Sequence, residues 1–255
     1  MSAALLELLA QNRFLPAPPA EMMFCGDGDY RAIGAEFLGH FIDLGGLTPH
    51  DRVLDIGCGI GRMAVPLTQY LRAPGCYDGI DINADGIAWC SASISTVYPD
   101  FRFTRLDLRH PLYNPAGAQD TAATALPFAD ASFDFICMIS VLTHLETDAL
   151  THYAAEAARL LAPGGRCFAT AFLMNAPARD ALAAGQGNIG FSAEGDAKIR
   201  FADATAPLAA VSFDEDFLVE KFLRAGLHRR AGTSYGNWSG RAGKNFQDLM
   251  VFEGA

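Results

Sequence analysis

The sequence predicts an α/β protein with a three-layer, doubly wound and mostly parallel sheet. Short apolar runs alternate with helical patterns along the chain, which is typical of consecutive βαβ units. One of these runs, at 53–56, leads directly into a glycine-rich turn. Another, at 133–140, is apolar at almost every position, as expected of a strand that helices cover on both faces.

The individual elements follow from local patterns. Apolar residues from Tyr30 to Ile42 repeat at helical spacing, and Pro-Gly-Gly at 163–165 ends the helix that starts at 148. The run from Ser212 to Glu215 matches a capping box, which predicts a helix from 212 to 225. Strands are expected at 53–56, 77–82, 101–108, 133–140 and 166–174, helices at 62–71, 87–97 and 148–161, and a final hairpin at 227–235 and 246–252.

No shift in composition marks a second domain, so residues 1–255 are expected to form one. Residues 175–210 are the least regular part of the chain, because 198–202 fits a short strand while the glycines and alanines fit a mobile loop equally well. We expect N-terminal lid helices at 1–48, a cofactor-binding core at 49–174, an insertion over the substrate side at 175–211, and a helix with the terminal hairpin at 212–255.

Composition and charge exclude several classes of partner. The chain has 19 basic and 29 acidic residues, and a net charge of −10 disfavours binding to nucleic acid. No stretch is long enough to span a membrane, and the start of the chain carries Glu7 and no basic residue, unlike a signal peptide. Six cysteines without a C-x-x-C pair, and histidines without metal-ligand spacing, predict neither zinc nor disulfides. A cytoplasmic protein without a metal is expected, and no pattern indicates its oligomeric state.

The most informative motif is Val-Leu-Asp-Ile-Gly-Cys-Gly-Ile-Gly-Arg at 53–62. Gly57, Gly59 and Gly61 admit positive φ angles and leave no Cβ to obstruct a ligand, so the turn is suited to close approach by a nucleoside. A dinucleotide site would require glycine at position 62, where this chain has Arg62. Asp55 precedes the first glycine by two residues.

Two further acidic residues follow predicted strands. Asp81 could accept hydrogen bonds from both hydroxyls of a ribose through its two oxygens, although a role in capping the next helix is the alternative. Asp107 could accept a hydrogen bond from an adenine amino group while Leu108 covers the ring. An ordinary turn residue is the alternative interpretation of Asp107.

These landmarks, together with Ser132-Phe-Asp-Phe and Leu160-Leu-Ala-Pro-Gly-Gly165, resemble the class I (Rossmann-like) S-adenosylmethionine-dependent methyltransferases of the small-molecule type. The resemblance covers about 53–173. It implies a seven-stranded sheet of order 3-2-1-4-5-7-6 with strand seven antiparallel, and S-adenosylmethionine as the cofactor, with S-adenosylhomocysteine as the product. The cofactor-binding residues it implies are Asp55, Gly57, Cys58, Gly59, Gly61, Asp81, Ile82, Asp107, Leu108 and Ser140.

In such a protein the transferred methyl group would lie near the residues that follow the fourth strand. His144 is the candidate base for removing a proton from a hydroxyl acceptor, because imidazole is largely neutral above its ordinary pKa of ~6.5. The alternative is that His144 packs beneath a lid or bonds a backbone carbonyl. Weaker candidates for substrate contact are Tyr30 and Arg31, which could instead be a solvated helix start, then Glu146, and finally Trp238 and Arg241, which could instead pack on their own strands.

Absent motifs narrow the acceptor. The chain lacks Asn-Pro-Pro-Tyr, a Pro-Cys pair and three adjacent cysteines, so the resemblance does not extend to nucleobase amino groups, cytosine carbon or arsenite. We expect a small organic acceptor with oxygen as the methylated atom. Methylation of nitrogen or carbon, and a non-catalytic S-adenosylmethionine-binding module, remain alternatives.

Overall fold

The computed structural model describes residues 17–23, 28–191 and 198–254. The first part of the lid expected at 1–48, residues 1–16, lies outside these residues. The first described elements are a short 3-10 turn, Ala20–Met22, and helix α2, Tyr30–Asp43, whose N-cap Asp29 accepts a hydrogen bond from the backbone N–H of Ala32 at 2.7 Å.

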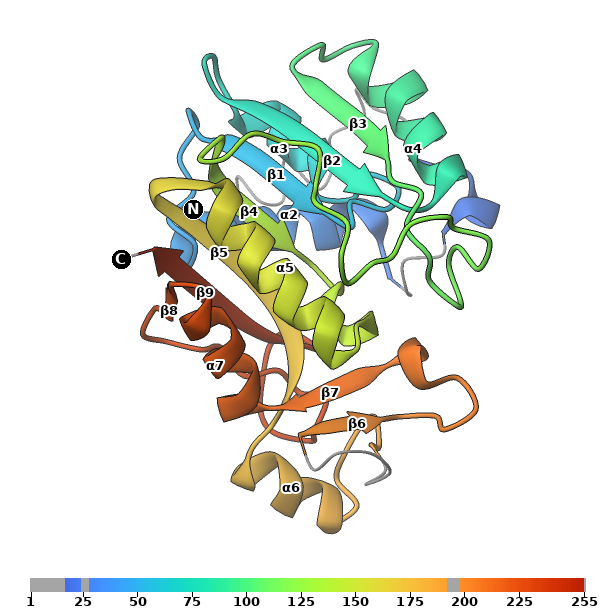
Figure 1. Cartoon of the computed structure of the whole chain (residues 1–255), viewed down its shortest axis with the longest axis vertical. Helices are drawn as coiled ribbons and strands as arrows, with labels where there is room; N and C mark the ends of the chain where they lie inside the picture. The colour runs from blue at the N-terminus through green and yellow to red at the C-terminus, as the bar shows by residue number, and fades with distance from the viewer. Residues whose placement is uncertain (1–16, 24–27, 192–197, 255) are drawn as a thin grey trace.

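The central sheet has the order that the sequence predicts (Figure 1). Strand β1 lies between β2 and β4, β3 forms one edge, and β5 follows β4, all in parallel. Strand β9 pairs antiparallel with β5 on one side and with β8 on the other, so β9 takes the place beside β5 that the predicted order gives to strand seven, and β8 takes the edge place of strand six. The bounds are β1 Arg52–Ile56, β2 Cys76–Asp81, β3 Phe101–Arg105, β4 Phe133–Met138, β5 Leu161–Met174, β8 Leu227–Arg229 and β9 Asp248–Gly254.

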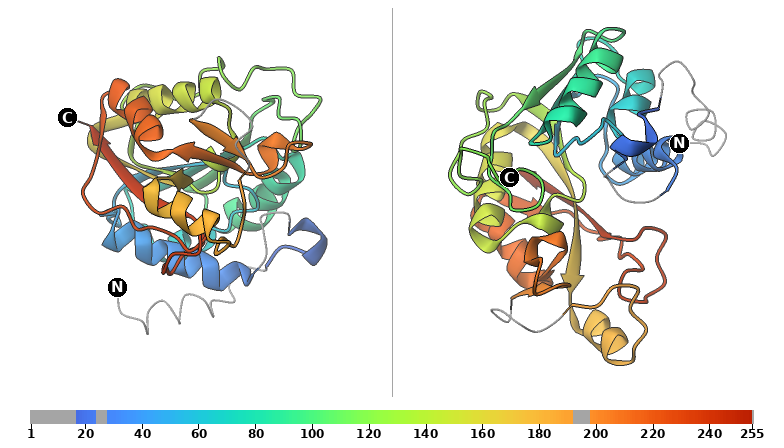
Figure 2. Two further views of the ribbon diagram at one scale, coloured as in Figure 1. Left: turned by 90° about the horizontal axis from the view of Figure 1, so that it is seen from below. Right: turned by 90° about the vertical axis from the view of Figure 1, so that its right-hand side faces the viewer.

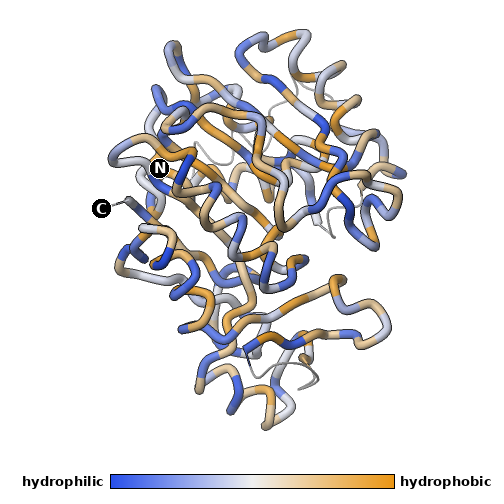
Figure 3. Tube along the Cα trace, viewed as in Figure 1, coloured by the Kyte–Doolittle hydropathy of each residue, from blue (hydrophilic) through white to orange (hydrophobic). Residues whose placement is uncertain are grey.

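Helices cover both faces of this sheet (Figure 2). Helices α2, α3 (Ala64–Tyr70) and α4 (Ala84–Cys90) pack on one face, where Val53 and Phe135 are buried among them. Helices α5 (Thr147–Leu160) and α7 (Glu215–Arg224) pack on the other, against Leu54 and Ile136. Successive residues of one strand thus serve opposite faces, which is why the central strands are largely apolar in Figure 3.

Beyond the sheet, the carboxyl end of β5 continues into a smaller unit (Figure 1). Its last residues pair with β7, Val211–Asp214, which in turn pairs antiparallel with β6, Ile199–Phe201. Helix α6, Ala176–Ala183, and the 3-10 turn Pro207–Ala209 complete what we call the β6–β7 unit, residues 176–191 and 198–214. The segment expected as an insertion therefore contains regular structure.

The start of the next helix differs from the predicted capping box. Helix α7 begins at Glu215, and Asp214 is its N-cap, with a side chain that accepts a hydrogen bond from the N–H of Phe217. Ser212 is instead a fully buried residue of β7. Pairing with β5 and β6 extends the chain through Asp214, and aspartate caps a helix as well as serine does, so the helix starts three residues later than predicted.

Candidate active site

A cavity of about 930 Å³ lies at the carboxyl ends of β1, β2 and β4. One half is formed by the turns after β1 and β2. The other half is formed by α2, the segment after β4, the β6–β7 unit, and the loop before β9. The volume is near the upper end of the ~300–1,000 Å³ range of ligand sites, so there is room for a nucleoside and a second molecule.

The glycine turn makes one wall of the cavity by its lack of side chains. Gly57, Gly59 and Gly61 have φ angles of 77°, 56° and 72°. A Cβ atom on Gly57 would lie 2.4 Å from Cγ2 of Val141, so this glycine lets the β1 turn touch the segment after β4. The N–H groups of Gly57 and Cys58 donate to the carbonyl oxygen of Ile80 at 2.8 and 3.0 Å. Because these two N–H groups bond within the protein, they are not available to a ligand. The role of the glycines here is to let neighbouring segments approach the turn closely.

Asp81 joins this turn to the end of β2 and lines the cavity. Its Oδ2 accepts from the N–H of Gly59 and its Oδ1 from the N–H of Asn83, both at 2.7 Å. Asn83, and not Asp81, is the N-cap of α4, since its side chain accepts from the N–H of Gly86. Each carboxylate oxygen retains a second lone pair that can accept a hydrogen bond from a ligand. Burial raises the pKa of Asp81, and its backbone hydrogen bonds oppose that shift.

Asp55 places a partly unsatisfied carboxylate at the cavity floor. It is 1% exposed, and its Oδ2 accepts a hydrogen bond from the hydroxyl of Tyr77 at 2.6 Å. Its buried Oδ1 accepts none from any nitrogen or oxygen of the described residues. Burial raises the pKa of Asp55 to about 6, against the lowering effects of Tyr77 and the thiol of Cys137. A buried carboxylate oxygen that no N–H or O–H of the described residues satisfies, with only a weak thiol donor nearby, is suited to a ligand's N–H or O–H group.

Asp107 lies at the side of the cavity, between two residues that line it, Leu106 and Leu108. Its Oδ1 is 3.3 Å from the side-chain nitrogen of Asn114, and its Oδ2 is 3.3 Å from the N–H of Ala118. These contacts are those of a residue that organises the following loop. The contact between Asp107 and an adenine amino group stays a prediction, whereas Leu108 and Ile82 already face the cavity.

Ser140 follows β4 with a φ angle of 59°, a conformation that is costly for a residue with a side chain. Its N–H donates to Oγ1 of Thr170 at 2.8 Å, and its hydroxyl accepts from Nε2 of Gln247 at 2.9 Å. Thr170 in turn donates to Gln247. Strand β5 and the loop before β9 thereby fix the backbone turn that leads to His144.

His144 presents one ring nitrogen to a backbone carbonyl. Its Nδ1 is 2.9 Å from the carbonyl oxygen of Leu208, which can only accept, so in the neutral ring Nδ1 carries the proton and Nε2 carries the lone pair. Burial lowers the pKa of His144, which keeps the ring neutral at pH 7. Nε2 of His110 donates to the carbonyl oxygen of His144 at 3.1 Å, and the ring of Tyr113 meets that of His144 edge-on at 5.3 Å.

Other residues predicted for substrate contact lie away from the cavity wall. Glu146 is exposed at the start of α5, and the hydroxyl of Tyr30 donates to the carbonyl oxygen of Ile60 at 2.7 Å. Neither they nor Arg31 line the cavity, to which α2 contributes Ile33, Glu36 and Phe37.

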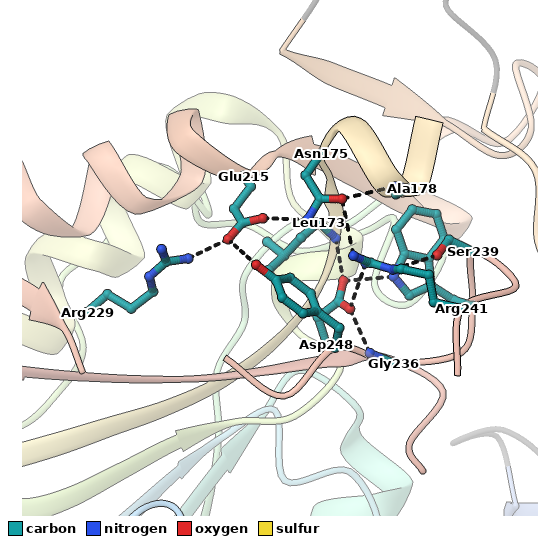
Figure 4. A network of polar contacts seen from close by, with 11 residues as sticks. Leu173, Asn175, Ala178, Glu215, Arg229, Gly236, Ser239, Arg241 and Asp248 are labelled. Carbon is teal, nitrogen blue, oxygen red and sulfur yellow. Dashed lines mark hydrogen bonds and ion pairs between the residues drawn. The ribbon is translucent and has the colours of Figure 1, made fainter. Parts of the chain in front are cut away.

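Trp238 and Arg241 hold the base of the loop before β9 (Figure 4). Trp238 is fully buried, and its Nε1 donates to Oδ2 of Asp248, the residue labelled at the centre of Figure 4, at 2.7 Å. Arg241 lies between Asp248 and Asn175, at 3.5 and 3.2 Å. This placement agrees with the alternative that the loop packs on its own strands.

The same loop supplies cavity residues that the sequence analysis did not name, at 244–247. They follow the glycines at 240 and 243 and come directly before the last strand. This position predicts a loop, but it does not indicate which side chains of the loop face a ligand. The sequence also did not indicate three aromatic residues that line the cavity, Tyr113, Tyr153 and Phe172. Each lies within or after an element whose pattern indicates only a loop or the core.

Within the described ranges, no group of three or more His, Cys, Asp or Glu side chains is placed to hold a metal ion. No helix in those ranges is long and apolar enough to cross a bilayer.

Comparison with known proteins gives consistent matches. Residues 54–169 match a family model described as "Methyltransferase domain". A fatty-acid O-methyltransferase from Mycolicibacterium smegmatis is 34% identical over 45% of this chain and 34% of its own length. An arsenite methyltransferase from Aquipseudomonas alcaligenes is 32% identical over 46% of this chain and 31% of its own length. The chain thus spans about a third of these two relatives.

A solved structure of a SAM-dependent methyltransferase from Methanosarcina mazei is 20% identical to this chain. It covers 84% of this chain and 96% of its own, with a TM-score of 0.57. At this identity the likeness concerns the fold, and it extends beyond the region of the family match to most of the chain.

Proposed function

We propose that the chain is a class I S-adenosylmethionine-dependent methyltransferase and that it transfers a methyl group from S-adenosylmethionine to a hydroxyl oxygen of a small organic acceptor; the match of residues 54–169 to a methyltransferase domain supports this. The choice of oxygen rests on the neutral His144 ring, whose Nδ1–H donates to the backbone carbonyl oxygen of Leu208. Bound S-adenosylmethionine would supply an activated methyl group and a neutral thioether leaving group.

The residues at the ends of β1 and β2 fit this cofactor. Asp81 would receive the two ribose hydroxyls on the lone pairs that Gly59 and Asn83 leave open. Asp55 would accept a donor from the amino acid end on its unsatisfied Oδ1. Ile82 and Leu108 would cover the adenine ring, as apolar side chains at a ligand pocket do.

His144 would remove the acceptor proton. As the acceptor oxygen forms its bond to the methyl carbon, the hydroxyl proton passes to Nε2 of His144, and the electron pair of the broken carbon–sulfur bond returns to sulfur. The products are a methyl ether, S-adenosylhomocysteine and a proton, which His144 then releases to water. A carbonyl partner on Nδ1 stabilises the imidazolium formed in this step.

The surroundings of His144 also limit competing reactions. The strained turn at Ser140 and the contact with Leu208 fix the ring against the cavity, and apolar residues such as Val141 and Leu145 flank it. Orientation of the acceptor and exclusion of water contribute to such transfers as much as proton removal does.

The test is methyl transfer from isotope-labelled S-adenosylmethionine to a panel of phenols and aliphatic alcohols by wild type, His144→Ala and His152→Ala. His152 is the matched control, because its ring bonds the carbonyl oxygen of Thr124 and does not line the cavity. We expect His144→Ala to lower kcat/KM by about 10²- to 10⁴-fold with unchanged affinity for S-adenosylhomocysteine, and His152→Ala to lower it only slightly.

Near-normal turnover by His144→Ala would show that His144 is not the base. If wild type binds S-adenosylmethionine but methylates only amines or carbon acids, the assignment of oxygen is overturned.

A further inference from the structure

We propose that the acceptor is a hydroxylated aromatic carboxylate, and that Lys244 binds its carboxylate group. This rests on the proposed methyl transfer and adds the class of acceptor. Lys244, Phe172 and Phe246 all line the cavity that contains His144.

The charges of the cavity wall divide between its two halves. Asp55 and Asp81 lie at the carboxyl ends of β1 and β2, and Arg62 lies in the turn after β1, where the cofactor is expected. On the other half, Glu36 accepts a hydrogen bond from Asn245 at 3.0 Å, and Lys244 forms no ion pair with any residue that the structure describes. Lys244 is exposed and lines the cavity, so its ammonium group, which no described carboxylate pairs with, is available to an anionic ligand there.

The backbone beside Lys244 is held in place. Asn245 is 9% exposed, and its side-chain nitrogen lies 3.0 Å from both Glu36 and His40 of α2. Gln247 bonds Ser140, four residues before His144. The ammonium group therefore extends from a fixed point of a loop that is tied to the same segment as the proposed base.

The base of this loop is anchored below the cavity (Figure 4). Asp248 accepts hydrogen bonds from Trp238 and from the N–H groups of Leu173 and Gly236, at 2.7, 2.7 and 2.8 Å. Because Asp248 is fully buried, these contacts fix the loop to the end of β5.

An aromatic wall lies next to Lys244. Phe172 and Phe246 meet edge-on with ring centroids 5.6 Å apart, and Trp238 supports Phe172 from behind at 5.5 Å. Ile189 and the small residues Ala209 and Ala210 continue this wall. Such a surface favours a flat apolar body, because aromatic rings pair well in edge-on and offset arrangements.

The overall charge of the protein strengthens the role assigned to Lys244. With a net charge of −10, the protein repels anions in general, so an anionic acceptor requires a local cation. The hydroxyl would face His144, the ring Phe172 and Phe246, and the carboxylate Lys244. A neutral analogue would fill the same space and leave the ammonium group without its partner.

The test measures binding to the protein saturated with S-adenosylhomocysteine by calorimetry. The probes are 4-hydroxybenzoate, 4-hydroxyphenylacetate and 4-hydroxycinnamate, each beside its primary amide. We expect wild type to bind at least one acid about 10-fold more tightly than its amide, and the preference to fall with ionic strength. Lys244→Met should lose the preference while its affinity for the amide stays unchanged.

Lys221→Met is the matched control, because Lys221 lies on α7 with its ammonium group over the ring of Phe217. It should retain the preference for the acid. Phe246→Ala should weaken acid and amide equally. Equal binding of acid and amide by wild type, no binding of any probe, or a preference that survives Lys244→Met would overturn the proposal.

Methyl transfer is measured separately on the same acids, so the two proposals fail in different ways. Binding that depends on Lys244 without methylation of any bound acid would contradict the proposed function. Methylation of neutral phenols without preference for acids would contradict only the class of acceptor.

Discussion

Nδ1 of His144 lies 2.9 Å from the carbonyl oxygen of Leu208, which joins the segment after β4 to the β6–β7 unit. The contact fixes the tautomer of a ring in the 3-10 turn Leu142–His144, after β4, by means of a residue from the β6–β7 unit. The β6–β7 unit is therefore part of the candidate active site, since it orients the proposed base as well as lining the acceptor half of the cavity with Ala209 and Ala210.

The pH dependence of turnover follows from the environment of this ring. Burial lowers the pKa of His144 below its ordinary value of ~6.5, and a base acts only when unprotonated, so kcat/KM should be constant at neutral pH and begin to fall only below that value. Rate profiles of wild type and His144→Gln with one phenolic acceptor check this. The variant should lack the acidic limb, and an unchanged profile would show that another group titrates.

The close approach of the glycine turn gives a second prediction. Gly57 and Gly164 have φ angles of 77° and 76°, but a Cβ on Gly57 would clash with Val141, whereas nothing lies within 4 Å of a Cβ on Gly164. Gly164→Ala should lower the free energy of unfolding by about 1 kcal/mol, the backbone cost alone. Gly57→Ala should cost at least ~2 kcal/mol more in urea unfolding. Equal losses in the two variants would mean that Val141 moves aside freely.

Asp55 should make stability depend on pH. Its pKa is about 6 in the folded protein and ~3.9 in the unfolded chain, so ionisation costs more in the folded state. Below about pH 4 Asp55 is protonated in both states and does not lower the free energy of unfolding. The free energy of unfolding should fall as the pH rises from about 4 to 6, and above about pH 6 it should stay about 3 kcal/mol lower.

The difference in unfolding free energy between Asp55→Asn and wild type isolates this contribution, because the other titrating groups cancel. In urea melts of the ligand-free protein, the variant should gain on wild type from pH 4 to pH 7. A difference that is independent of pH would contradict the burial argument for Asp55.

Much of the fold could be predicted because local patterns and topology agree. The continuous apolar strands, the glycine turn after β1 and the acidic end of β2 each have a direct physical cause in the parallel sheet, and the strand order follows the resemblance. The prediction of a capping box at Ser212 was wrong, because the same short stretch also fits a strand and it pairs with β5.

The acceptor half of the site depends on contacts between distant segments. Nothing local distinguishes Trp238, which is buried on Asp248, from Lys244 on the same loop, which lines the cavity. The partner of His144 is 64 residues away at Leu208, in a region whose sequence fits a loop as well as a strand. Such pairings arise from the packing of the β6–β7 unit, which periodicity alone does not encode.

The most direct test of the account is calorimetric titration of S-adenosylhomocysteine into wild type, Asp81→Ala and Asp100→Ala. Asp100 is the matched control, because it is exposed in the turn before β3 and does not line the cavity. We expect wild type and Asp100→Ala to bind with equal affinity, and Asp81→Ala to bind at least about 10-fold more weakly, since hydrogen bonds to a charged group contribute ~1.5–3 kcal/mol each. Failure of wild type to bind, or unchanged binding by Asp81→Ala, would contradict the central claim.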